Sequence, residues 1–211
     1  MTSIQNDLKI YLKPTWVIDS KSEAVRSKVA LLIERSSTQE DKAKQLFYFV
    51  RDEVKYNPYL ISYAIEDYQA SRILQRKEGF CIQKAVLLTA LARAVGIPAR
   101  LGFADIKNHL APKKLLEKMG TNLFIYHGYS ELWLNSRWVK ATPAFNIEMC
   151  NRFELKPVEF DSVRDAVFHK RSKRGCRHIE YIKYHGTFAD LPFEDIMQAF
   201  VDQYPETGKI N

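Results

Sequence analysis

One segment of this chain is apolar on nearly every side, and it constrains the fold more than any other feature. Between residues 82 and 95 only four polar residues interrupt a run of aliphatic side chains. A helix without a polar face belongs in the middle of a domain rather than on its surface. Gly96 and Pro98 follow directly, and both favour the end of a helix. The sequence therefore predicts a central helix that other elements enclose.

The segments on either side of this helix predict an α+β fold. Two amphipathic helices are expected before it, because Ser20 and Thr38 each begin a capping signal; the second should end near Tyr56. After it the apolar spacing changes to that of strands, which are expected at residues 99–105, 126–134 and 137–142. Short helices are expected at residues 113–119 and 193–200. Helices first and strands afterwards are the order of an α+β domain.

The composition is that of an ordinary globular protein of 211 residues, and we expect residues 1–211 to form a single domain. Three cysteines are too few for a disulfide framework, and none lies in a C-x-x-C pair, so we expect neither a metal site nor a cofactor. The N-terminal residues lack the apolar segment of a secretory signal, and no run is long enough to span a membrane. We therefore expect a cytoplasmic protein without membrane contact, and its oligomeric state is left open.

Cys81 lies directly before the central helix. A thiol at a helix N-terminus faces unpaired backbone N–H groups and the positive end of the helix dipole, which favour the nucleophilic thiolate. Gly79 lets the chain turn tightly into the helix. The same position also suits a small buried hydrophobic residue, so position alone does not decide between the two. Cys150 and Cys176 lie in stretches without a clear pattern, and we take both as incidental.

A nucleophilic cysteine needs a base, and His127 is the one histidine of five on a clear strand. Alternation places His127, Tyr129 and Glu131 on the same face of that strand. A histidine on a strand is also often a hydrogen-bonded structural residue, so the residues alone leave a Cys81–His127 pair at even odds.

Two segments resemble those of the transglutaminase-like superfamily of papain-like thiol enzymes. In Glu78–Asp105, a Gly-x-Cys leads into a helix and is followed by an Ala-Arg-x-x-Gly-Ile-Pro-Ala-Arg run. In Tyr126–Pro143, His127 and Trp138 match the histidine strand and the tryptophan after its hairpin. The resemblance covers a core at about residues 19–146, with residues 147–211 as an extension packed on it. It implies a papain-like fold with N-terminal helices and a nucleophile on a buried helix, packed on an antiparallel sheet.

The resemblance fails at the third catalytic position, where the family normally has an Asp-Pro pair and this chain has Thr142-Pro143. If residues 135 and 136 form the hairpin loop, Tyr129 pairs with Thr142, which then lies one diagonal step from His127 on the same face. A hydroxyl can orient an imidazole but carries no charge to stabilise the imidazolium. We expect a Cys81–His127 dyad assisted by Thr142.

Other residues are alternatives for assisting the Cys81–His127 dyad. Glu131 is four residues along the strand from His127, about 13 Å away, and does not easily take the orienting role. Asp105 and Asn146 remain alternatives if the fold brings them close. For the oxyanion, the backbone N–H of Cys81 is the first candidate donor, and Gln75, six residues earlier, is the second. Gln75 also fits an ordinary solvent-exposed helix end.

These residues favour acyl transfer, in which Cys81 attacks a peptide or protein amide and water or an amine resolves the thioester. We expect hydrolysis of a peptide or carboxamide. The alternative is a weak or inactive binding module that keeps the fold, which the threonine at position 142 favours. The net charge of +7 is concentrated in Arg164–Arg177, which could bind an acidic partner or form a solvated loop. That stretch contains six cations: Arg164, Lys170, Arg171, Lys173, Arg174 and Arg177.

Overall fold

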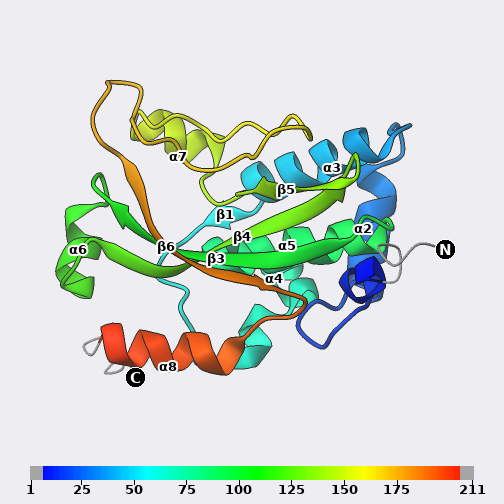
Figure 1. Cartoon of the computed structure of the whole chain (residues 1–211), viewed down its shortest axis with the longest axis horizontal. Coiled ribbons are helices and arrows are strands. Elements are labelled where there is room, and N and C mark those ends of the chain that lie inside the picture. Colours follow the sequence, from blue (N-terminus) through cyan, green and yellow to red (C-terminus); the bar gives the residue numbers. More distant parts are fainter. Residues whose placement is uncertain (1–6, 205–211) are drawn as a thin grey trace.

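The computed structural model describes residues 7–204 and shows an α+β fold built on a four-stranded antiparallel sheet (Figure 1). The strand order is β5-β4-β3-β6. The strands are β3 (Ala99–Asn108), β4 (Leu123–Leu134), β5 (Arg137–Ala141) and β6 (Ile179–Phe188). Two short strands, β1 (Lys55–Tyr56) and β2 (Glu78–Gly79), form a separate parallel pair, and β2 lies just before the central helix in the chain. The expected fold class is confirmed.

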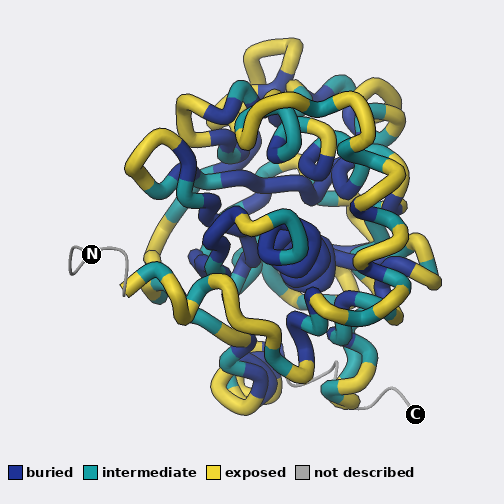
Figure 2. The backbone as a smooth tube through the Cα atoms, turned by 90° about the vertical axis from the view of Figure 1, so that its right-hand side faces the viewer, coloured by how far each residue is buried: buried dark blue, intermediate teal, exposed yellow. Residues whose placement is uncertain are grey.

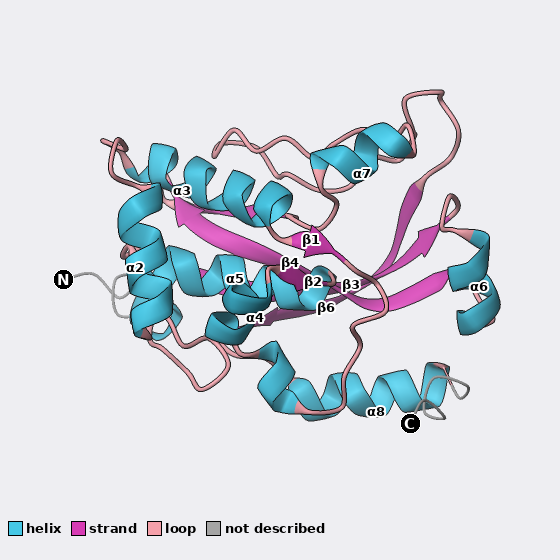
Figure 3. Cartoon of the chain, turned by 180° about the vertical axis from the view of Figure 1, so that it is seen from behind, coloured by secondary structure: helices cyan, strands magenta, loops and turns pink. Residues whose placement is uncertain are grey.

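Helices cover one face of the sheet (Figure 3). The central helix α5 lies directly on β3 and β4, and the helices before it pack around α5. The central helix α5 spans Cys81–Ala94, and the helices before it are α2 (Glu23–Leu32), α3 (Gln39–Tyr48) and α4 (Ala70–Arg76). The other helical elements are η1 (Lys9–Leu12), η2 (Phe49–Glu53), η3 (Ile65–Tyr68), α6 (Lys113–Met119), α7 (Ile147–Arg152) and α8 (Phe193–Gln203). Within residues 7–204 no helix is both long and apolar enough to cross a membrane.

Helix α5 is buried from Ile82 to Arg93, as its sequence predicts, and it lies in the middle of the molecule in Figure 2. Its polar side chains all find hydrogen-bond partners, so their burial is compensated. For example, Thr89 Oγ1 donates to Ser130 Oγ of β4, and the Arg93 guanidinium donates to the carbonyl oxygens of Ala99 and Ala189. The polar residues that interrupt this apolar helix therefore form hydrogen bonds to the elements that enclose it.

Local signals place most element boundaries, with two corrections. Thr38 caps α3 as expected, whereas Ser22 and not Ser20 caps α2. The second helix also ends earlier than Tyr56, because α3 passes into the wider turn η2 and the chain then enters β1. In the β4–β5 hairpin, Leu134 pairs with Arg137, and residues 135 and 136 both have positive φ, as a two-residue type I′ loop requires.

The stretch after β5 supplies an element that the sequence did not predict. Strand β6 pairs with β3 along its length and completes the sheet. It lacks the regular alternation of a half-buried strand, since Ile182, Lys183 and Tyr184 are consecutive and all exposed. Helix α8 packs against β4, where the Tyr204 hydroxyl donates to the Leu123 carbonyl and accepts from the Ile125 N–H.

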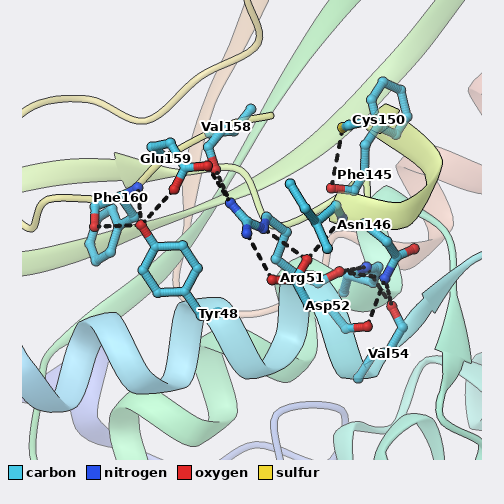
Figure 4. A network of polar contacts seen from close by, with 12 residues as sticks. Tyr48, Arg51, Asp52, Val54, Phe145, Asn146, Cys150, Val158, Glu159 and Phe160 are labelled. Atoms are coloured by element: carbon cyan, nitrogen blue, oxygen red, sulfur yellow. Dashed lines mark hydrogen bonds and ion pairs between the residues drawn. The ribbon is translucent and has the colours of Figure 1, made fainter. Parts of the chain in front are cut away.

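A network of polar contacts ties η2 and β1 to the start of α7 (Figure 4). Asn146 is at its centre: its Oδ1 accepts from the Tyr56 N–H at 2.6 Å, and its Nδ2 donates to the carbonyl oxygens of Arg51 and Val54. Lys84 of α5 donates to the same two carbonyls. Because β1 carries Tyr56, this network fixes a residue that lines the pocket described below.

Replacing Asn146 by Leu should therefore destabilise the fold. The Tyr56 N–H loses its acceptor, while the two carbonyls keep Lys84 as a donor, so a loss of about 1–3 kcal/mol in the free energy of unfolding is expected. Denaturant unfolding measures this. Asn151→Leu is the matched control, since Asn151 lies on the same helix but is exposed, and it should change stability by less than about 0.5 kcal/mol. Equal effects of the two changes would contradict the assignment.

Candidate active site

Cys81 is the first residue of α5 and lines a pocket together with His127. Burial raises the pKa of the Cys81 thiol to about 11, although the backbone N–H groups of Gly128, Ile82 and Cys81 itself act in the opposite direction. The helix N-terminus does offer donors to the sulfur, as expected from its position. Desolvation outweighs these donors, so the net effect of the surroundings is to favour the neutral thiol.

Gly128 sets how closely the histidine strand approaches the cysteine helix. A Cβ at position 128 would lie 2.8 Å from the Cα of Ile82, a distance that requires the backbone to move. The absent side chain therefore allows β4 to lie directly on the first turn of α5, with the Gly128 N–H beside the Cys81 sulfur. This contact brings the residue before Gly128 to the pocket that Cys81 lines.

That residue is His127, which pairs with Ala104 of β3 and is buried. Burial lowers the pKa of its imidazole to about 3. Its ring packs 4.8 Å from the ring of Phe168 and 6.4 Å from that of Tyr181, measured between centroids. Both aromatic residues come from the stretch after β5, so the C-terminal part of the chain forms one wall around the histidine.

At neutral pH the two pKa values describe a neutral thiol and a neutral imidazole, not an ion pair. No hydrogen bond joins the Cys81 thiol to the His127 ring. Catalytic hydrogen bonds are often long without substrate and tighten when it binds. The Nε2 atom of the His127 ring is fully buried and has no hydrogen-bond partner among residues 7–204.

The third position is occupied by a hydroxyl, as expected, but it does not reach the imidazole. Thr142 is fully buried one residue beyond the last pair of the β4–β5 hairpin, Ser130 with Ala141. Neither Thr142 Oγ1 nor His127 Nε2 has a hydrogen-bond partner among residues 7–204. Both polar atoms are therefore buried without a hydrogen-bond partner in the described part of the chain.

Tyr181 of β6 lies beside His127 as a further candidate, which the sequence offered only as one of three possible contributors from the C-terminal third, with Glu180 and Asp190. Burial raises the pKa of its hydroxyl, whereas the Phe168 N–H and the neighbouring Thr142 hydroxyl act in the opposite direction. The two hydroxyls are thus neighbours, although their geometry does not make a well-formed hydrogen bond. Because β6 was not predicted, no sequence signal placed Tyr181 beside His127.

The other proposed supporting residues have partners away from His127. Glu131 forms an ion pair with Arg100, in which the nitrogen and oxygen are 2.6 Å apart. Asn146 is engaged in the backbone network of β1 and η2. Gln75 lies on the exposed side of α4 and does not line the pocket, so the fold does not bring it to the site. Backbone N–H groups at the start of α5 are therefore the candidate oxyanion donors that lie beside Cys81.

Asp105 holds a bulge directly before His127. The β3–β4 pairing shifts between Ala104 and Ile106, and Tyr126 adopts a left-handed conformation with φ of 50°. The Tyr126 N–H donates to Asp105 Oδ1 at 3.0 Å, and His185 Nε2 lies 2.6 Å from the same oxygen. The His185 ring also stacks on Tyr126 at 4.1 Å. Such a conformation costs about 1–3 kcal/mol and persists only where its surroundings enforce it.

The basic stretch Arg164–Arg177 lies outside this site. All six cations of the Arg164–Arg177 stretch are exposed, and three of them pair with carboxylates: Arg164 with Asp161, Arg174 with Glu154, and Arg177 with Glu180. Within the described part of the chain, no group of three His, Cys, Asp or Glu side chains is arranged to hold a metal ion.

A cysteine at the start of a buried helix, a histidine on the adjacent antiparallel strand and a pocket between them define the papain-like class of thiol-enzyme folds. The chain belongs to the transglutaminase-like superfamily, whose match covers residues 27–143. No match is found among curated proteins.

Comparison with solved structures includes one of similar fold. A candidate cysteine protease from Cytophaga hutchinsonii aligns with a TM-score of 0.52 and 13% identity, over 89% of this chain and 57% of that protein. The chain thus spans little more than half of that protein's length, and the likeness concerns the fold alone. An arylamine N-acetyltransferase from Mycobacterium abscessus aligns with a TM-score of 0.41 and 14% identity, over 62% of this chain and 45% of that one.

The neutral pair predicts how Cys81 responds to pH. A thiol with a pKa of about 11 ionises only as the pH rises towards that value, so iodoacetamide labelling should increase about tenfold per pH unit from pH 7 to 10. Peptide mass spectrometry separates Cys81 from the exposed Cys176, which serves as an internal reference. Fast labelling that is independent of pH above pH 5 would instead indicate a preformed ion pair.

The bulge predicts a positioning role for Asp105. Asp105→Ala removes the acceptor of the Tyr126 N–H and should shift the NMR signals of the His127 ring, whereas Asp105→Asn keeps an acceptor oxygen and should restore them. Asp190→Ala, a change at an exposed carboxylate elsewhere, is the control and should leave those signals unchanged. Unaltered His127 signals in Asp105→Ala would show that the bulge does not depend on this carboxylate.

Proposed function

We propose that this chain catalyses acyl transfer on amides, with water as the usual acceptor, so that the net reaction is hydrolysis of a peptide or carboxamide. The observation that carries the proposal is the shared pocket of Cys81 and His127, with backbone N–H groups around the sulfur. Membership of the transglutaminase-like superfamily supports thiol chemistry of this kind. The three free thiols suit a reducing compartment such as the cytoplasm.

The reaction starts from the neutral pair. The Cys81 sulfur attacks the amide carbonyl carbon as its proton passes to His127, and backbone N–H groups at the start of α5 stabilise the oxyanion. The imidazolium then gives this proton to the leaving nitrogen, the C–N bond breaks and a thioester remains. Water, deprotonated by His127, attacks the thioester, the C–S bond breaks and the thiol is restored. An amine in place of water would give transamidation.

The site stabilises the imidazolium poorly. Burial without a charged partner lowers the pKa of His127 to about 3, and the Thr142 hydroxyl carries no charge to offset this. Replacing the orienting aspartate of a serine triad by a neutral residue lowers turnover about 10⁴-fold. Thiol enzymes depend less on that carboxylate, and a slow enzyme is the consequence we infer.

The first test detects the thioester. Wild-type protein is incubated with p-nitrophenyl butyrate, and intact mass with peptide mapping locates the acyl group. We expect a butyryl adduct on Cys81, its absence in Cys81→Ala, and slower formation in His127→Ala with the fold retained. No adduct on Cys81 in a folded wild-type protein would favour the binding-module alternative instead.

A second prediction concerns the third position. Thr142→Asp introduces a carboxylate on the face that bears His127, so the His127 pKa should rise from about 3 towards neutrality and acylation should accelerate by about tenfold or more. Thr142→Asn is the matched control, because it has similar size and no charge. NMR titration and the rate of p-nitrophenolate release measure the two effects, with thermal melting to verify folding. Equal rates for the Asp and Asn variants would contradict a role for charge here.

A further inference from the structure

The pocket beside Cys81 has no charged lining. It is formed where the start of α5 meets β3, β4, α6 and α8, and no Asp, Glu, Lys or Arg of residues 7–204 lines it. Its apolar walls include Leu115 and Met119 of α6, Ile106 and Phe124 of the sheet, and Phe200 of α8. Besides Cys81, His127 and tyrosines, Asn108 is its one polar side chain, and the Oδ1 of Asn108 already accepts from the Leu110 N–H.

The position of Cys81 in this wall determines which part of a substrate enters. The carbonyl carbon must meet the sulfur, so the groups bonded to it extend either into the pocket or towards solvent. The acyl group stays attached through both steps, while the amine must leave after the first. A more open groove shares Tyr56, Pro58, Pro112 and Met149 with the pocket and contains charges of both signs. This groove suits the polar leaving group, and the closed pocket suits the acyl group.

The chemistry and size of the pocket restrict that acyl group. Transfer of a charged or unpaired polar group into such surroundings costs several kcal/mol. The cavity measures about 80 Å³. An enclosed apolar cavity of about 150 Å³ accepts benzene, so this smaller pocket favours a short hydrocarbon chain over an aromatic ring.

We propose that the pocket selects a short, uncharged aliphatic acyl group, one of a few carbons, as the part of the substrate that becomes the Cys81 thioester. This rests on the proposed acyl transfer for its catalytic meaning, but the binding preference is a property of the pocket. It assigns Leu115 on α6 as a specificity residue, because Leu115 is buried and faces the cavity whereas its neighbour Leu116 does not line it.

Binding is tested without catalysis, in Cys81→Ala, by NMR titration with carboxamides. From acetamide to butanamide, affinity should rise about fourfold per methylene, the expected gain for a buried CH₂ group. Succinamate, which ends in a carboxylate, and benzamide should each bind at least about tenfold more weakly than butanamide. Similar affinity for butanamide, succinamate and benzamide would overturn the proposal.

Three variants on α6 make the test specific. In the Cys81→Ala background, Leu115→Phe fills the cavity and should weaken butanamide binding about tenfold or more, while Leu116→Phe should change it less than about twofold. Leu115→Ala enlarges the cavity and should move the preferred chain to a longer one. Equal effects of the two Phe variants would place the ligand elsewhere.

Acylation of wild-type protein by p-nitrophenyl esters of the same acyl groups separates this proposal from the enzymatic one. Selective amide binding with no Cys81 adduct from any ester would leave the pocket assignment intact and overturn the proposed reaction. Rapid acylation by acetyl, succinyl and benzoyl esters alike, with unselective amide binding, would support the reaction and overturn the aliphatic preference.

Discussion

The contact between Gly128 and the first turn of α5 is the constraint on which the rest of the site depends. With no side chain at position 128, strand β4 lies against the backbone of Ile82, and the strand delivers His127 to the pocket that Cys81 lines. The same contact contributes to the partial burial of Cys81. The closeness that assembles the pair therefore also removes water from it, and desolvation then sets the protonation state of both members.

Burial and the threonine at position 142 both favour the neutral forms of Cys81 and His127. An aspartate at that position would favour the imidazolium and hence the thiolate, whereas a hydroxyl leaves both groups in their neutral forms. The neutral pair is consistent with the uncharged pocket that surrounds it, in which an isolated ion pair would be poorly solvated. The site as a whole is a low-polarity environment for thiol chemistry.

Structural features that are set by residues close together in the chain could be predicted from the sequence. Features that are set by contacts between distant parts of the chain could not. The central helix, the Thr38 cap and the β4–β5 hairpin follow from periodicity, capping and turn residues close in the chain. Strand β6 could not be predicted, because its exposed residues mask the strand period and its pairing with β3 provides the stabilisation. The neighbourhood of His127 was missed for the same reason, since Phe168 and Tyr181 are distant from it in the chain and contact it only in the folded structure. Cys81 and His127 were placed by motif, whereas their pKa values depend on burial that a sequence does not display.

The bulge at Tyr126 links the histidine to the last strand of the sheet. Its left-handed backbone is held by Asp105 together with His185 of β6, which lies 80 positions after Asp105 in the chain. Both the cysteine helix and the histidine strand precede β6 in the chain, so the backbone beside His127 is held by a strand that comes after both of them. The last strand of the sheet therefore does more than complete the sheet edge: through His185 it joins the Asp105 contact that holds the backbone next to the histidine.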